Sequence, residues 1–122
     1  MKIIGLGTDI VEIIRIEKAI NKTDGFLIRV FTGEEINYCE KKPRKYENYA
    51  GRFCAKEAIA KALGTGVRDF NLIDIEIIND ELGKPEVNFY GTLEEKFKKR
   101  EVLLTISHCK EYATATAIIT EK

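Results

Sequence analysis

The sequence predicts an α+β fold in which a mostly antiparallel sheet packs against one long central helix. β-rich segments open the chain and then follow one another at hairpin-like spacing through its C-terminal half. Between them, residues 46–63 carry apolar side chains at helical spacing. A chain of 122 residues can bury one core of ordinary size, so we expect residues 1–122 to form a single domain.

The first strand is expected over residues 2–11, where "KIIGLGTDIV" is rich in β-branched side chains. With a period of two, Gly5, Gly7 and Asp9 share one face of this strand. The other face carries Ile4, Leu6, Thr8 and Ile10. Two glycines leave a hollow, and Asp9 would lie beside it. The alternative is a strand end that needs glycine for a bend and leaves Asp9 in water or as a helix cap.

Two short helices are expected next. Beyond the strand the apolar spacing becomes helical, with Arg15 and Lys18 on a basic flank. Thr32 then precedes Glu35 by three residues, which is the spacing of a capping box and predicts the start of a second helix. Pro43 would end that helix.

The long helix should run from about residue 46 to residue 63 and stop at Gly64 and Gly66. One continuous stripe on it is apolar and should pack on the sheet. That stripe consists of Ala55, Ala58, Ile59, Ala62 and Leu63.

Strands are expected in the C-terminal half within residues 71–80, 84–91, 101–108 and 112–119. A turn around Gly83 should join the first two. A short helix with a capping box from Thr92 to Glu95 should lie between the second and the third. We expect the last three residues, "TEK", to be frayed.

Charge and composition exclude several classes of protein. Twenty basic residues balance twenty acidic ones, which gives no support to a general nucleic-acid binder. No apolar run is long enough to span a membrane, and the start lacks an export signal, so we expect a cytoplasmic protein without membrane contact. Cys39, Cys54 and Cys109 lack paired spacing and are interpreted as reduced thiols.

Glu57 and Lys61 lie almost opposite the apolar stripe of the long helix. On a solvated face they would form an ordinary i, i+4 ion pair worth a few tenths of a kcal/mol. The same face also carries Phe53 and Ala60, which indicates that something covers it. A covered carboxylate needs a cation, and either Lys61 or a metal ion can supply one.

Asp9 and Glu57 would suit Mg²⁺ if the strand and the helix are neighbours, because one or two carboxylates commonly hold this ion, with water and phosphate completing its shell. The loop "GTGVR" offers backbone N–H groups for phosphate oxygens, with Lys61 and Arg68 close by. The alternative is a plain glycine cap, since the P-loop pattern is absent.

Four segments in order resemble the signatures of the holo-acyl-carrier-protein synthases, the small bacterial branch of the 4′-phosphopantetheinyl transferases. These are "GLGTDIVEIIRI", "AGRFCAKEAIAKALGTG", "DIEIINDELGKPEV" and "ISHCKEYATATAI". The similarity covers residues 4–119, nearly the whole chain. One such motif is weak, whereas four in order are highly specific.

The resemblance implies the 4′-phosphopantetheinyl transferase fold and a Mg²⁺-dependent reaction that serves fatty acid biosynthesis. Family enzymes move 4′-phosphopantetheine from coenzyme A to a serine of apo-acyl carrier protein and release adenosine 3′,5′-bisphosphate. Small members are homotrimers with active sites between subunits. The face bearing Phe53, Glu57 and Lys61 would then meet ligand and a neighbouring protomer.

Site residues carry over by motif position. The catalytic residues would be Asp9, Glu57 and Lys61, of which Asp9 and Glu57 hold the metal. The residues that bind coenzyme A would be Arg52, Lys61, Gly64, Thr65, Gly66, Ser107 and His108. Arg15 and Arg29 would bind the acyl carrier protein. The stretch "KKPRK" resembles a basic segment at the 3′-phosphate of coenzyme A. Without the motif around it, His108 would be interpreted as a turn residue.

Two other functions stay open from the residues alone. The first is a module that binds a nucleotide or a carrier protein without catalysis; the pair of carboxylates with Lys61 argues against it, because bare binding does not need them. The second is a nucleic-acid binder, which the zero net charge and the lack of a basic and aromatic platform disfavour.

Overall fold

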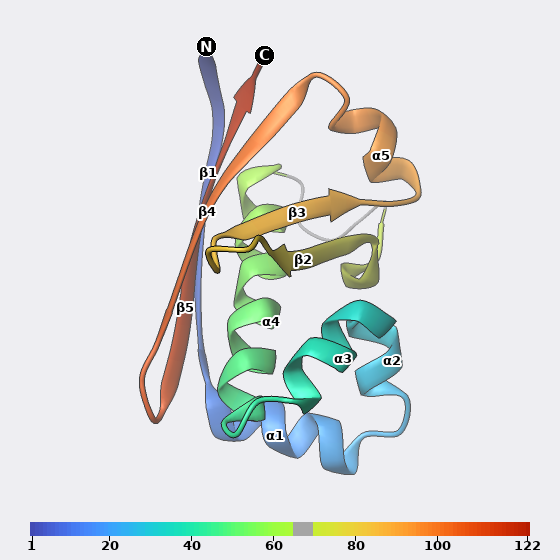
Figure 1. Cartoon of the computed structure of the whole chain (residues 1–122). Coiled ribbons are helices and arrows are strands. Elements are labelled where there is room, and N and C mark those ends of the chain that lie inside the picture. The colour runs from blue at the N-terminus through green and yellow to red at the C-terminus, as the bar shows by residue number, and fades with distance from the viewer. Residues whose placement is uncertain (65–69) are drawn as a thin grey trace.

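The computed structural model describes residues 1–64 and 70–122. The first half contains β1 (Lys2–Glu12), α1 (Ile13–Lys22), α2 (Phe26–Val30), α3 (Gly33–Glu40) and α4 (Lys45–Ala62). The second half contains the 3₁₀ helix η1 (Leu72–Asp74), β2 (Ile75–Asn79), β3 (Pro85–Phe89), α5 (Thr92–Lys96), β4 (Arg100–His108) and β5 (Tyr112–Glu121). Figure 1 shows both ends of the chain at the same end of the molecule.

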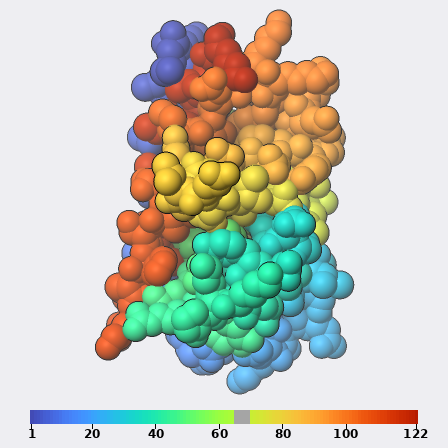
Figure 2. All heavy atoms as spheres, in the orientation of Figure 1, coloured from blue at the N-terminus to red at the C-terminus, as the bar shows by residue number. Residues whose placement is uncertain are grey.

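The described strands form two antiparallel sheets, one with the order β1-β5-β4 and one made of β2 and β3. Helix α4 runs along the larger sheet, and the smaller sheet and the N-terminal helices pack against its other sides (Figure 1). In the space-filling view, α3 and the β2–β3 turn hide most of α4 (Figure 2). The predicted α+β class with a long central helix is confirmed.

Glycines allow α4 to lie directly on β1. A Cβ atom added to Gly5 would collide with the carbonyl oxygen of Ala62, and one added to Gly7 would collide with that of Ala58. The hollow predicted beside these glycines is therefore filled by the helix backbone. Asp9, the next residue on the same face, lies at the margin of this contact and is half-buried.

The predicted stripe of α4 is buried, with only Leu63 partly accessible. The helix stops where Gly64 adopts a positive φ of 81°, which a glycine tolerates best. Gly66, the second predicted stop, lies outside the described residues. Burial extends well beyond the stripe and includes the whole side chain of Lys56.

Local signals predicted some elements and misplaced others. Thr32 and Glu35 form the expected capping box at α3. At α5 the N-cap is Gly91, so Thr92 lies inside the helix and the predicted box is wrong. Helix α2 was not predicted, because its five residues are too short to show a helical period.

The C-terminus is not frayed as expected. Strand β5 continues to Glu121, and Thr120 is buried. The backbone N–H of Lys122 donates a hydrogen bond to the Lys99 carbonyl across 2.9 Å. Pairing with β1 and β4 holds this segment in the sheet to its penultimate residue.

The thiols of Cys39, Cys54 and Cys109 are free, as predicted. Burial raises the pKa of Cys39 to about 11 and that of Cys54 to about 12, so both stay protonated and unreactive. Cys109 is exposed after β4.

Candidate active site

Asp9 of β1 and Glu57 of α4 line one pocket of about 330 Å³. Phe53 of α4 and Phe26 of α2 form part of its wall, and Arg15 of α1 also lines it. The predicted neighbourhood of the strand and the helix is thus present. The close backbone contact of α4 with the glycines of β1 is what brings the two carboxylates together.

Lys61 joins the two elements through direct hydrogen bonds. Its Nζ atom donates to Asp9 Oδ1 across 3.0 Å and to the Thr8 carbonyl oxygen across 3.0 Å. The lysine follows Glu57 by one helical turn, so its side chain reaches the same side of α4. About half of its side chain is exposed, and the pair therefore adds little to folding stability.

The electrostatics of the pocket favour a bound cation. Burial raises the pKa of Glu57, and the neighbouring Asp9 carboxylate raises it further, while Lys61 opposes the shift. A raised carboxyl pKa means that the negative charge is not fully compensated. Oxygen ligands with such a charge match the preference of Mg²⁺.

The donor set fits an ion that keeps much of its own shell. Within residues 1–64 and 70–122, no group of three or more His, Cys, Asp or Glu side chains could hold a metal. Two carboxylates would bind Zn²⁺ poorly, because that ion is usually held by three or four protein ligands. Mg²⁺ needs only one or two carboxylates and takes water and phosphate for the rest.

The two arginines predicted to bind a carrier protein lie at different places. Arg15 is exposed and lines the pocket of Asp9 and Glu57. Arg29 lies on α2, is also exposed, and donates from Nη1 to the Asp24 carbonyl oxygen across 3.0 Å. Arg15 is therefore the arginine beside the carboxylates, whereas Arg29 does not line their pocket.

A second pocket, of about 280 Å³, lies on another side of α4 and contains Arg52 and His108. The Arg52 guanidinium stacks on Tyr38 at 4.2 Å from the ring centroid, and its Nη2 atom donates to Asn79 Oδ1 across 2.6 Å. Among the described residues, Arg52 Nε is a buried side-chain atom without a hydrogen-bond partner. Unpaired buried donors are rare, so this guanidinium in the pocket wall has hydrogen-bonding capacity that the described residues do not use.

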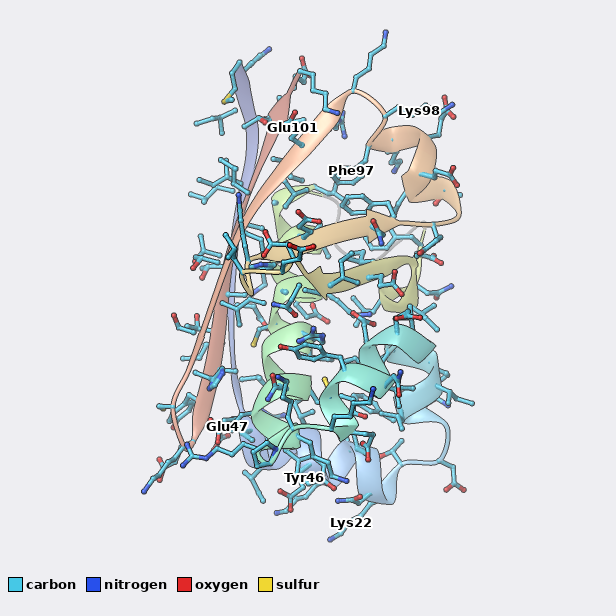
Figure 3. The ribbon with its side chains drawn as sticks, viewed as in Figure 1. Lys22, Tyr46, Glu47, Phe97, Lys98 and Glu101 are labelled. Carbon is cyan, nitrogen blue, oxygen red and sulfur yellow. The ribbon has the colours of Figure 1, made fainter. Side chains whose placement is uncertain are left out.

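His108 enters this second pocket from the end of β4. Its Nδ1 atom lies 2.9 Å from Glu47 Oε1, near the N-terminal end of α4 where Figure 3 labels Glu47. Ser107 precedes it and points to the opposite face of the sheet, because side chains alternate along a strand. The structure therefore separates these two neighbouring residues.

The predicted site residues fall into two groups within one chain. No described residue lines both pockets, since one holds Asp9 and Glu57 and the other holds Arg52 and His108. Gly64 is exposed after the end of α4. The predicted phosphate-binding residues Thr65 and Gly66, together with Arg68, lie outside the described residues.

Several polar residues around α4 were not found from the sequence. Tyr38, Glu47 and Asn79 line the second pocket, and Lys56 forms an ion pair with Glu35 in which both side chains are fully buried. One signal was available for Lys56. It precedes the buried residues 59 and 60 by one helical turn, which places its side chain on a covered face.

Comparison with known proteins agrees with the family resemblance. The model of the 4′-phosphopantetheinyl transferase superfamily matches residues 5–117. A holo-[acyl-carrier-protein] synthase of Fusobacterium nucleatum is 50% identical over 121 residues, covering 96% of this chain and 98% of that protein. One from Clostridium tetani is 51% identical over 120 residues, covering 96% and 95%.

Solved structures show the same fold. A holo-(acyl-carrier-protein) synthase from Bacillus anthracis in complex with coenzyme A (3′,5′-ADP) has a TM-score of 0.84 and 39% identity, covering 100% of both chains. One from Neisseria meningitidis has a TM-score of 0.88 and 33% identity, covering 98% and 99%. With nearly complete coverage in sequence and in structure, the chain belongs to the holo-acyl-carrier-protein synthases of the 4′-phosphopantetheinyl transferase superfamily.

Proposed function

We propose that this protein transfers 4′-phosphopantetheine from coenzyme A to a serine of apo-acyl carrier protein, releases adenosine 3′,5′-bisphosphate, and so supplies holo-carrier for fatty acid biosynthesis. Its relatives are named holo-acyl-carrier-protein synthases. The observation that carries the proposal is the pocket that Asp9 and Glu57 share, together with the hydrogen bond from Lys61 to Asp9. Phosphoryl transfer mainly needs positioning and charge neutralisation, which such a group provides.

Asp9 and Glu57 would hold Mg²⁺, which when bound offsets the charge of the pyrophosphate oxygens. Lys61 would stabilise the charge that develops on the departing adenosine bisphosphate, since its long exposed side chain can turn from Asp9 to a phosphate. The carrier serine loses a proton as it attacks. Asp9 and Glu57 are the carboxylates of this pocket that can accept it.

The second pocket would bind another part of coenzyme A through Arg52 and His108. Arg52 has an unused Nε donor, and its guanidinium is already fixed by Asn79 and Tyr38. A fixed guanidinium suits phosphate recognition because its donors lie in one plane. Ser107, Gly64, Thr65 and Gly66 remain proposed contacts of coenzyme A by motif position.

The division of the site into two pockets supports a homotrimer with active sites between subunits. β1 and β4 are the two edges of the three-stranded sheet, and one pocket lies beside each edge. In a closed ring of copies, a head-to-tail contact can bring one edge of a subunit against the other edge of its neighbour. The pocket of Asp9 would then face the Arg52 pocket of the next copy.

The outer face of the larger sheet supports the same assembly. Leu6, Ile118 and Leu103 are direct cross-strand neighbours on β1, β5 and β4. Leu6 is 68% exposed and Leu103 is 50% exposed. A row of apolar side chains on an open sheet face is typical of a surface that is buried in an oligomer.

The acyl carrier protein would dock on α1 and α2. Carrier proteins of this family are acidic. Arg15 supplies exposed positive charge at the pocket of Glu57, and Arg29 supplies it on α2, whose Phe26 lines the same pocket. Complementary charge steers such encounters and makes them sensitive to salt.

One assay tests the reaction. The protein is incubated with coenzyme A, Mg²⁺ and apo-acyl carrier protein, and the carrier is then weighed by mass spectrometry. We expect a mass increase of one phosphopantetheine group. No increase with coenzyme A still bound would support the alternative of a binding module.

We further propose that residues 1–122 form one domain that works in the cytoplasm. Among the described residues, one cluster of buried apolar side chains extends from α1 to β5. Within residues 1–64 and 70–122, no helix combines the length and apolarity that a membrane span requires.

A further inference from the structure

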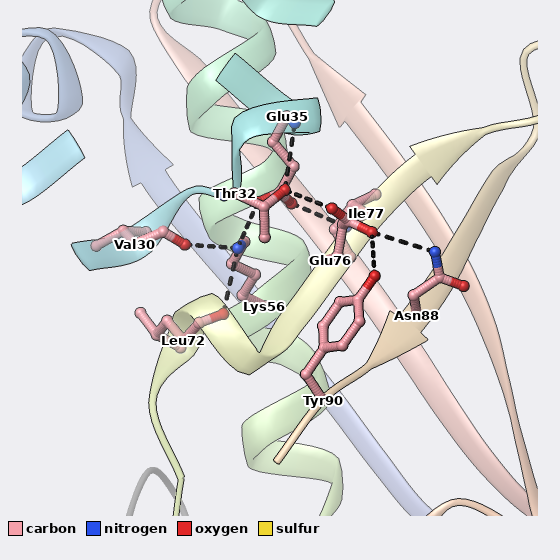
Figure 4. Close-up of polar contacts among 9 residues, drawn as sticks. All are labelled: Val30, Thr32, Glu35, Lys56, Leu72, Glu76, Ile77, Asn88 and Tyr90. Atoms are coloured by element: carbon pink, nitrogen blue, oxygen red, sulfur yellow. Dashed lines mark hydrogen bonds and ion pairs between the residues drawn. The ribbon is translucent and has the colours of Figure 1, made fainter. Parts of the chain in front are cut away.

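Lys56 lies at the centre of a buried group of hydrogen bonds between four elements (Figure 4). Its side chain is fully buried. The Nζ atom donates to the Val30 carbonyl oxygen across 2.6 Å, to Glu35 Oε1 across 2.7 Å and to the Leu72 carbonyl oxygen across 3.2 Å. An ammonium group has three donors, and each has an oxygen acceptor here. We call Lys56 with these three acceptors the Lys56 cluster.

Glu35 is satisfied as completely as Lys56. Its Oε1 atom also accepts from the Thr32 backbone N–H across 2.8 Å, and its Oε2 atom accepts from the Ile77 N–H across 2.8 Å. Glu35 therefore joins the start of α3 to β2 and to α4. Because a buried carboxylate without partners is very costly, this arrangement has little freedom to shift.

A second carboxylate extends the group outward. Glu76 Oε2 accepts from Thr32 Oγ1 across 2.5 Å, and Oε1 accepts from Tyr90 Oη across 2.9 Å and Asn88 Nδ2 across 3.2 Å. Thr32 thus contacts both carboxylates, since its Oγ1 donates to Glu76 and its backbone N–H donates to Glu35 Oε1. The smaller sheet is thus linked to Lys56 of α4, through Glu76, Thr32 and Glu35.

The Lys56 cluster reaches the active site through α2. Val30, whose carbonyl accepts from Lys56, is the last residue of this helix. Near the start of the same helix, Phe26 lies 6.2 Å from Phe53 between ring centroids, and both rings line the pocket of Glu57. A helix of five residues is not stable alone, so its position depends on contacts such as this one.

We propose that Lys56 is a positioning residue that holds α2 against α4, so that Phe26 closes the wall of the catalytic pocket and Arg29, on the same helix, is presented to the carrier protein. The inference rests on the function proposed above. An apolar side chain at residue 56 would fill the same space without directing the Val30 carbonyl. Directed hydrogen bonds fix orientation, whereas a buried ion pair by itself often adds no net stability.

Two variants separate positioning from stability. Lys56→Met leaves Glu35 buried and unpaired, which lowers the melting temperature. The double variant Lys56→Met/Glu35→Gln removes both charges and recovers part of that loss, but it does not restore the bond to Val30. Lys98→Met is the matched control, because Lys98 forms an exposed pair with Glu95 at the far end of the molecule, where Figure 3 labels it.

We expect the double variant to raise the KM for acyl carrier protein about tenfold, which corresponds to one lost charge-assisted hydrogen bond, and to leave the KM for coenzyme A within about twofold. A purely structural role would lower the active fraction, and hence kcat, without changing either KM. An unchanged carrier KM, or equal rises in both KM values, overturns the proposal.

Phe26→Ala provides a second test of the proposal, which does not require the Lys56 variants to fold. It removes the wall that the Lys56 cluster is proposed to hold, and the carrier KM should rise in the same way. If Phe26→Ala leaves the carrier KM unchanged, α2 does not carry the effect and the proposal fails.

Hydrogen exchange tests the inference without any transfer assay. The Arg29 N–H donates to Gly25 and the Phe31 N–H to Leu27, whereas the Phe97 N–H of the distant α5 region donates to Leu93. In the double variant the amides of Arg29 and of Phe31, the residue that caps α2, should exchange at least about tenfold faster, with Phe97 unchanged. Equal exchange at α2 contradicts the positioning role. A wild-type protein that fails to modify the carrier contradicts only the proposed function.

Discussion

Lys61 Nζ on α4 lies 3.0 Å from Asp9 Oδ1 on β1. A lysine predicted to face phosphate and an aspartate predicted to hold metal therefore meet directly. The contact exists because α4 rests on the glycine backbone of β1, which also brings Glu57 to the same pocket. The following predictions test what this arrangement does.

Glu57→Gln should reduce Mg²⁺-dependent transfer at least about 100-fold while the fold stays intact. Because the pKa of Glu57 is raised in the folded state, ionisation of this carboxyl group lowers the free energy of unfolding as the pH rises through that pKa. The neutral amide removes this cost, so the melting temperature at pH 7 should be equal or higher. Turnover is measured with the carrier mass assay, and Glu95→Gln on the exposed surface is the control. Undiminished turnover would reject Glu57 as a metal ligand.

Arg15→Glu should raise the KM for acyl carrier protein about tenfold and leave the KM for coenzyme A nearly unchanged, because Arg15 is an exposed cation at the pocket of Asp9 and Glu57. Added salt should weaken carrier binding more in the wild type than in the variant. Lys98→Glu, a charge reversal far from the pocket, serves as the comparison. Equal effects of Arg15→Glu on both substrates would argue against a docking role.

Gly7→Ala should destabilise the protein by about 3 kcal/mol, because its Cβ would collide with the Ala58 backbone, which cannot move aside. Displacement of α4 should also reduce transfer in whatever fraction still folds. Gly33→Ala is the matched control, since nothing lies within 4 Å of a Cβ atom there. Denaturant unfolding measures the free energy of unfolding of both variants. Similar stability of the two variants would show that α4 does not depend on this close approach.

Mixing two inactive variants tests whether active sites lie between subunits. Asp9→Asn damages the first pocket, and Arg52→Ala damages the second. Each variant should be inactive alone, whereas an equal mixture refolded together should regain about a quarter of wild-type activity. In random trimers, about a quarter of the interfaces join an intact Asp9 pocket of one subunit to an intact Arg52 pocket of the next. Asp9→Asn mixed with Glu57→Gln should stay inactive, since both damage the same pocket. A mixture that never regains activity would place the site within one chain.

Leu6→Glu should break the assembly without unfolding the chain, because Leu6 is 68% exposed on the outer face of the sheet. Sedimentation should show a trimer for the wild type and a monomer for the variant, with transfer lost in parallel. Leu82→Glu changes another exposed leucine, 95% accessible, and should leave the trimer intact. A monomeric wild type, or a trimeric Leu6→Glu variant, would contradict the assembly.

Local patterns determined much of the fold. The alternation of β1, the capping box of Thr32 and Glu35 and the apolar stripe of α4 all involve residues within a few positions of each other, so periodicity and capping rules apply to them directly. The same rules misplaced the cap of α5 at Thr92 and missed α2, because Gly91 can also begin a helix and five residues show no period.

The sequence by itself determined the fold class and the long helix, its motifs indicated the family, and its residue types suggested the candidate site. Only the tertiary structure decided that the glycines of β1 receive α4, that Lys56 is buried against Glu35, and that Asp9 and Arg52 lie in separate pockets. These facts depend on contacts between residues far apart in the chain. Such contacts follow from how helices and sheets pack, which no local repeat encodes.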